Sequence, residues 1–116
     1  MRSLAEARQF EKEHEISADK RPFFHLTPRT GWMNDPNGFS DFGGCVHLFY
    51  QYYPYSTGLG DMYWGHVRTR DLIRWEYLPA AMAPDTPYES GCFSGTAIED
   101  KNLGHVLLYT AHQNHS

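Results

Sequence analysis

The sequence has few cysteines, no run of basic residues and no long apolar stretch. Its two cysteines, Cys45 and Cys92, are too few and too far apart for a disulfide framework or a four-ligand zinc site, and we interpret both as buried thiols. Ten Lys and Arg stand against 14 Asp and Glu, which gives a net charge of −4. This balance argues against nucleic acid or an anionic membrane as a partner.

The N-terminal region also lacks the apolar core of a signal peptide, so we predict a cytoplasmic protein without membrane spans. Residues 3–6 match a capping box, and good helix formers follow as far as about Glu15. A short helix is therefore expected there. We treat residues 1–20 as a helical extension to which we assign no chemistry.

Aromatic residues are abundant, at 16% of the chain, which suits β-strands and also the binding of sugars. From residue 21 onward, short β-branched and aromatic runs are separated by Gly, Pro, Asn and Asp, which predicts an all-β domain over residues 21–116. The expected strands lie at about 38–40, 45–53, 63–69, 75–80, 95–99 and 106–112. Segments 41–44 and 100–104 are expected to be hairpin turns.

One stretch, residues 31–38, places Asp35 between a Trp-Met-Asn run and the sequence Asp-Pro-Asn-Gly. That tetrapeptide has the composition of a β-turn. Two interpretations follow from it. In the first, the turn joins two strands and Asp35 only accepts a backbone hydrogen bond. In the second, the turn holds a catalytic carboxylate at the mouth of a pocket with an aromatic floor.

The segment from Trp32 to Gly38 resembles the signature of invertases and fructanases, glycoside hydrolase family 32. Four further segments are similar to family motifs in the same order: Phe49-Tyr50-Gln51-Tyr52, Trp64-Gly65-His66, Asp71-Leu72 through Trp75, and Phe93-Ser94-Gly95-Thr96. The resemblance begins at about Phe23. It implies a five-bladed β-propeller, of which this chain would hold about two blades as the N-terminal portion of a longer polypeptide.

The resemblance also implies that Asp35 is the nucleophile of a retaining hydrolase. Its substrates would be terminal non-reducing β-D-fructofuranosides, such as sucrose or sucrose-6-phosphate. The residues implied in substrate binding are Asn34, Gln51, Trp64, Phe93 and Ser94. For Gln51, Trp64 and Phe93 the alternative is a structural place in the core. The sugar is the only partner expected.

No cofactor is expected, and no metal site. His105, His112 and His115 form the only local group of histidines, and they lack the spacing of a zinc site.

The chain departs from the family pattern in two ways. Arg70-Asp71 is followed by Leu72 rather than Pro, and no Glu directly precedes a Cys, so the transition-state-stabilising Asp and the acid/base Glu of the family are absent. We therefore expect the chain alone to be inactive. Leu59 stands where family members carry a Trp, which removes an aromatic platform from the expected site.

Three glutamates, Glu76, Glu89 and Glu99, are interpreted as solvated strand or loop residues rather than as the missing acid. Two alternative functions remain open at this point. One is an exo-fructanase or fructosyltransferase of the same fold, and the other is a non-catalytic remnant that binds fructan.

Overall fold

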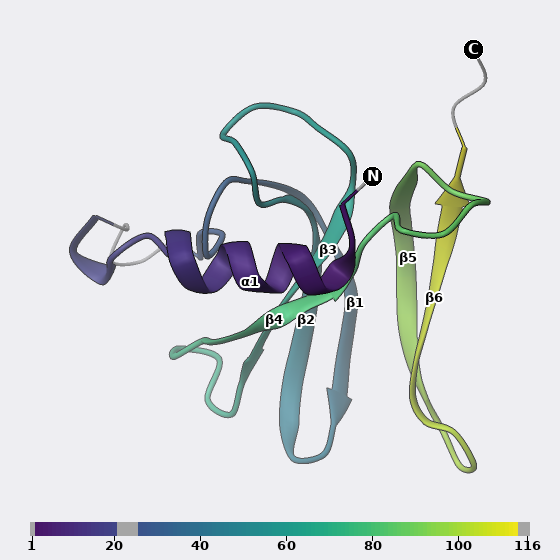
Figure 1. Ribbon diagram of the computed structural model, residues 1–116. Helices are drawn as coiled ribbons and strands as arrows, with labels where there is room; N and C mark the ends of the chain where they lie inside the picture. Colours follow the sequence, from purple (N-terminus) through teal and green to yellow (C-terminus); the bar gives the residue numbers. More distant parts are fainter. Residues whose placement is uncertain (1, 21–25, 114–116) are drawn as a thin grey trace.

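The structure, a computed structural model, describes residues 2–20 and 26–113 (Figure 1). Its elements are α1 (Leu4–His14), η1 (Ala18–Lys20), β1 (Trp32–Phe42), β2 (Cys45–Tyr53), β3 (Tyr63–Thr69), β4 (Glu76–Met82), β5 (Gly91–Asp100) and β6 (Gly104–His112). Strands β1 to β4 form one antiparallel sheet in chain order, and β5 pairs with β6 in a second. The all-β prediction with one N-terminal helix is confirmed.

A four-stranded antiparallel meander is the repeating unit of β-propellers. The expectation of about two blades corresponds to one such sheet and two strands of another. In Figure 1 the β5–β6 pair stands beside the sheet, at the β1 side, and α1 crosses in front of the sheet. None of the helices in the described part of the chain is long and apolar enough to cross a membrane.

Both predicted hairpin turns are confirmed. Phe42 pairs with Cys45 across a two-residue loop, and Gly43 and Gly44 have φ values of 63° and 81°, which a type I′ turn requires. At the other turn Asp100 pairs with Gly104. The Asp100 carboxylate there accepts hydrogen bonds from two backbone N–H groups of the turn.

The turn predicted at residues 35–38 is wrong, because β1 runs straight through it. Within the described residues β1 is the edge strand of its sheet, a position in which proline is tolerated. Two irregularities in the pairing with β2 absorb the unusual sequence, between Met33 and Pro36 and between Asn37 and Ser40. The turn-like composition thus encodes β-bulges within a strand.

Strand β2 is buried on both faces, which explains its nearly continuous apolar sequence. The core cluster on the α1 side consists of Ala7, Tyr50, Tyr52, Tyr63, Val67, Ala80 and Ala83. The cluster on the β5 side consists of Phe49, Trp64 and Cys92. Successive residues of a strand point to opposite faces, so β2 contributes alternately to the two clusters.

Helix α1 is attached to the sheet by a buried carboxylate. Glu11 is 1% exposed and accepts hydrogen bonds from the Tyr52 hydroxyl at 3.1 Å and the Ala80 N–H at 3.0 Å. Burial raises the pKa of Glu11, and these two hydrogen bonds oppose the rise. The predicted capping box of Ser3 and Glu6 is present at the start of the helix.

The raised pKa predicts how Glu11 affects stability. The folded state binds the Glu11 proton more tightly than the unfolded state, so this contribution to stability is full at acid pH and is lost as the pH rises through the folded pKa. Glu11→Gln keeps an acceptor without the charge. In the complete protein, the melting temperature of the variant minus that of the wild type should therefore increase from about pH 5 to about pH 8.

Glu13→Gln is the matched control, since Glu13 lies exposed on the same helix. Its melting temperature should differ from the wild type by the same small amount at each pH. A Glu11→Gln difference that stays constant with pH would contradict the prediction.

Candidate functional site

Asp35 and Asn34 lie at a β-bulge opposite Gln51. Met33 pairs with Tyr52 and Pro36 with Tyr50, so two residues of β1 face the single residue Gln51 of β2. Such a bulge turns side chains away from the regular alternation and occurs often beside active sites. Both Asn34 and Asp35 are exposed, and no hydrogen bond to the Asp35 carboxylate is found within the described residues.

A second bulge lies in β5. Phe93 pairs with Thr110 and Gly95 with Tyr109, which leaves Ser94 as the additional residue. Ser94 is exposed. Phe93 as a residue is 37% exposed, and its ring stacks on His112 with centroids 4.1 Å apart. Phe93 is therefore available at the surface rather than packed in the core.

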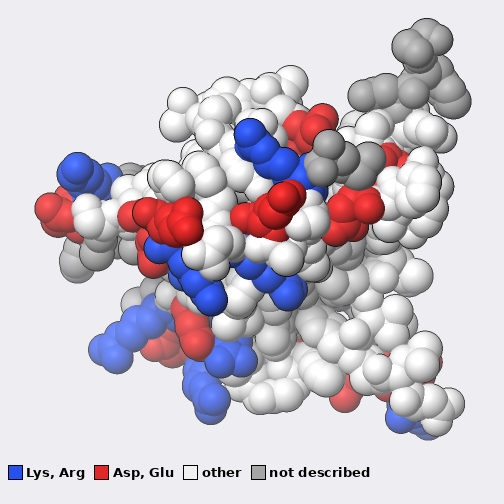
Figure 2. Space-filling model, viewed as in Figure 1, with Lys and Arg blue, Asp and Glu red and all other residues white. Residues whose placement is uncertain are grey.

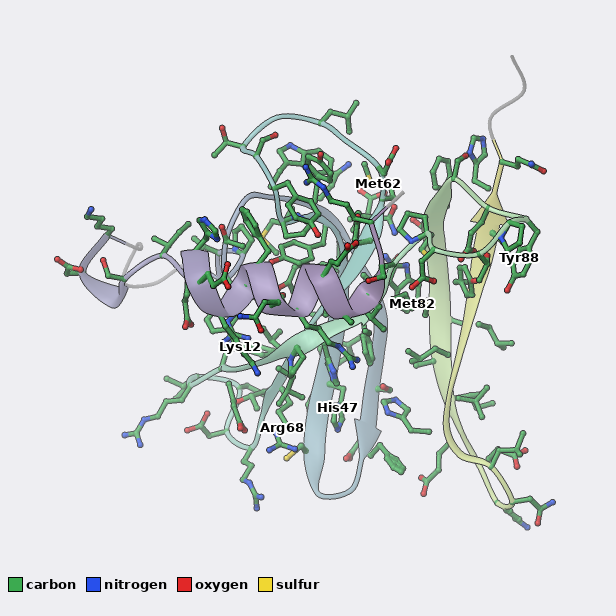
Figure 3. All side chains as sticks on the ribbon, viewed as in Figure 1. Lys12, His47, Met62, Arg68, Met82 and Tyr88 are labelled. Carbon is green, nitrogen blue, oxygen red and sulfur yellow. The ribbon has the colours of Figure 1, made fainter. Side chains whose placement is uncertain are left out.

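In the described part of the chain, three hydrogen bonds attach β5 to the four-stranded sheet and to Met62, the residue before β3. The Gln51 Nε2 donates to the Cys92 carbonyl and the Trp64 Nε1 to the Phe93 carbonyl, each at 3.0 Å. The Cys92 N–H donates to the Met62 carbonyl at 2.8 Å, and Figure 3 labels Met62 beside β5. Consecutive backbone groups just before Ser94 are thus fixed by side chains of β2 and β3.

The predicted site residues divide into two groups. Asn34, Asp35, Phe93 and Ser94 are exposed on β1 and β5, two strands that pack against each other. The close approach of these strands is visible at Gly38, where an added Cβ would lie 2.8 Å from the Phe49 ring and 3.3 Å from the Ala97 Cβ.

Gln51 and Trp64 form the second group. They are 5% and 0% exposed. This burial favours the structural alternative for Trp64. Gln51 donates through Nε2, and no partner of its Oε1 is found among residues 2–20 and 26–113.

The comparisons with known proteins decide the family. The model of the glycosyl hydrolases family 32 N-terminal domain matches residues 25–116. The chain belongs to glycoside hydrolase family 32. It is 53% identical over 98 residues to a sucrose-6-phosphate hydrolase of Zymomonas mobilis, a match that covers 84% of this chain and 19% of that relative. It is also 53% identical over 85 residues to a levanase of Bacillus subtilis, covering 72% of this chain and 12% of the levanase.

Among solved structures, the family 32 β-fructofuranosidase BmSUC1 of Bombyx mori matches with a TM-score of 0.79 and 46% identity. The match covers 97% of this chain and 23% of that one. These findings confirm the predicted family and the N-terminal part of its β-propeller. The chain spans about a fifth of the length of the sucrose-6-phosphate hydrolase it matches.

One of the three glutamates set aside as solvated is buried. Glu89 is 3% exposed and accepts a hydrogen bond from the Tyr109 hydroxyl at 2.7 Å, so the prediction for this residue is wrong. That bond, with burial, raises the pKa of Tyr109. Glu76 and Glu99 are exposed, as expected. Glu89 follows a loop containing two prolines, and its sequence context gives no sign of burial.

The histidines do not gather as their positions in the sequence suggested. His105 and His112 lie seven residues apart on β6, about 23 Å at about 3.3 Å per residue, and His115 is outside the described residues. Instead, His47 Nδ1 lies 2.9 Å from His66 Nε2. Burial lowers the pKa of His66 to about 3. No group of three or more potential metal ligands is found in the part of the chain that the structure describes.

Sequence reasoning missed Asn37, which belongs to the signature segment. Its side chain is buried, and within the described residues its Nδ2 has no hydrogen-bond partner. A buried donor without a partner costs about 1 to 3 kcal/mol. The turn interpretation treated Asn37 as part of a bend, and regular strand alternation from the exposed Asp35 would not have revealed its burial either. Leu59, in contrast, is 75% exposed in the loop between β2 and β3.

The hydrogen bond from Trp64 to β5 leads to a prediction. Trp64→Phe leaves the Phe93 carbonyl without its donor, which should lower the free energy of unfolding by about 1 to 3 kcal/mol. Hydrogen exchange of the backbone around residues 91–95 should become faster in the complete protein.

Trp75→Phe is the control, because Trp75 is partly buried against the cluster on the α1 side. It should leave exchange in residues 91–95 unchanged. Equal exchange rates in the wild type and in Trp64→Phe would show that this hydrogen bond does not hold β5.

Proposed function

We propose that the complete protein hydrolyses terminal non-reducing β-D-fructofuranosides with retention of configuration, and that Asp35 is the nucleophile. The observation that carries the proposal is the bulge at Asn34-Asp35 opposite Gln51. It places an exposed carboxylate on the strand next to β5, on which Phe93 and Ser94 are also exposed. Membership in family 32 supports the same reaction.

Retaining glycosidases use two carboxyl groups about 5 to 5.5 Å apart. In the proposed reaction Asp35 attacks the anomeric carbon of the fructosyl unit, while a second carboxyl group protonates the oxygen of the leaving group. Water then cleaves the fructosyl ester and frees Asp35. We propose that the second group comes from parts of the complete protein outside residues 1–116, and that this chain alone is inactive.

The remaining predicted residues have distinct parts in the proposal. The Asn34 amide and the Ser94 hydroxyl hydrogen-bond to sugar hydroxyls, and the exposed Phe93 ring packs against the apolar face of the sugar. Gln51 accepts from a hydroxyl through Oε1 while its Nε2 remains bound to Cys92. Trp64 does not contact the sugar in this proposal. It positions Phe93, because its Nε1 donates a hydrogen bond to the Phe93 carbonyl.

Sucrose or sucrose-6-phosphate is the proposed substrate. The equal identity to a sucrose-6-phosphate hydrolase and to a levanase keeps an exo-fructanase or fructosyltransferase as the second candidate. Initial rates on sucrose, sucrose-6-phosphate and inulin separate these two. A protein that binds inulin without releasing fructose from any of them would instead be a non-catalytic binding protein. A cytoplasmic location stays a prediction.

The nucleophile assignment predicts the effect of one atom-for-atom replacement. Asp35→Asn in the complete protein should lower the rate of fructose release from sucrose by at least about a thousandfold, since an amide does not attack the anomeric carbon. Asp41→Asn removes a charge from an exposed position of the same strand and is the matched control.

The control should keep nearly full activity. Near-normal turnover by Asp35→Asn would refute the assignment. So would a covalent fructosyl intermediate trapped on a different side chain and located by peptide mass spectrometry.

A further inference from the structure

A small cavity at the turn between β3 and β4 is lined by three arginines. It has a volume of about 240 Å³, and Arg68, Arg70 and Arg74 line it together with Asp71 and Glu76. Figure 2 shows basic side chains gathered at the lower left, below α1, and Figure 3 labels Arg68 in this region. Other residues separate these arginines in the chain, so the sequence shows no basic run, and the turn brings them together.

Only one of the three guanidinium groups has a carboxylate partner in the described part of the chain. Arg68 donates from Nε and Nη2 to the two carboxylate oxygens of Glu76, at 2.7 and 3.2 Å. No hydrogen bond or ion pair of the Arg70 or Arg74 side chain is found among the described residues, and both are exposed. Arg74 interacts electrostatically with Asp71 and Arg70 with Glu76, but within the described residues neither guanidinium group forms a direct ion pair.

The second carboxylate at the cavity, Asp71, is hydrogen-bonded to groups of the turn itself. Asp71 Oδ1 accepts hydrogen bonds from the Thr69 hydroxyl and from the N–H groups of Ile73 and Arg74, at 3.1, 2.9 and 2.8 Å. Thr69 Oγ1 accepts in turn from the N–H groups of Asp71 and Leu72. With three arginines against two carboxylates, the lining has a net charge of +1, although the whole chain has −4.

We propose that this cavity binds a small phosphate-bearing ligand, with Arg70 and Arg74 donating to the phosphate oxygens. Arg68 adds the N–H groups that Glu76 leaves unused. The planar guanidinium group matches phosphate geometry and can donate two parallel hydrogen bonds. A volume of about 240 Å³ equals that of about eight water molecules at about 30 Å³ each, which is room for a phosphate group and part of an attached sugar.

The cavity is separate from the bulge that carries Asp35. Met33, beside that bulge, pairs with Tyr52 of β2, whereas Thr69 at the cavity pairs with Val46. Val46 and Tyr52 are six positions apart on β2, about 20 Å at about 3.3 Å per residue. The proposal depends on the charges at the cavity and not on the reaction at Asp35, so either can fail without the other.

Isothermal titration of the complete protein with inorganic phosphate at low salt tests the proposal. Arg70→Gln combined with Arg74→Gln should weaken phosphate binding at least about tenfold, because charged hydrogen bonds are lost. The matched control is Lys12→Gln combined with Lys101→Gln, which removes the same charge from two exposed lysines outside the cavity. It should bind as the wild type does.

A second titration with glucose 6-phosphate, with glucose as the neutral reference, distinguishes the two sources of the phosphate group. Tighter binding than that of inorganic phosphate, lost in the double arginine variant, indicates a sugar phosphate. Equal binding indicates phosphate alone. Circular dichroism confirms that each variant is folded, and the single arginine variants replace the double one where it is not. Absence of phosphate binding to the wild type, or equal binding to the arginine variants, would overturn the proposal.

Discussion

The site depends on one mismatch between neighbouring strands, in which two residues of β1 must fit opposite one residue of β2. A regular strand would turn Asn34 and Asp35 to opposite faces of the sheet, toward α1 and toward β5. The bulge removes that alternation, so that both residues are exposed at the outer strand of the sheet. The mismatch lies on the edge strand of the sheet, where the following Pro36 is tolerated.

The position of β5 relative to the bulge on β1 is fixed by side chains on one face of the four-stranded sheet. Gln51 and Trp64 donate to consecutive carbonyl groups of β5 from the same face of the sheet. The bond from Gln51 is buried and the bond from Trp64 is partly buried, so an unpaired carbonyl at either position would be costly. The two side chains therefore relate the β5 bulge at Ser94 to the β1 bulge at Asp35 across the junction of the sheets.

Much of the fold follows from local sequence signals. Three elements can be predicted from a few neighbouring residues each: the apolar strand β2, the Gly43-Gly44 turn and the capping box of Ser3. The bulges do not, because the residues of a bulge resemble those of a turn and only the pairing with a neighbouring strand distinguishes them. For the same reason the sequence indicated Asp35 as a candidate but gave the wrong backbone around it, and it gave no sign that Glu89 is buried.

The two ends of the four-stranded sheet differ in a way that composition does not reveal. At one end the exposed carboxylate of Asp35 lies beside Asn34 and opposite Gln51 of β2. At the turn between β3 and β4, the Asp71 carboxylate accepts hydrogen bonds from its own loop, and three arginines against two carboxylates leave the cavity lining with a net charge of +1. A chain with a net charge of −4 can therefore have a local positive charge at one cavity. A ligand interacts with the local charge of the lining residues and not with the net charge of the chain.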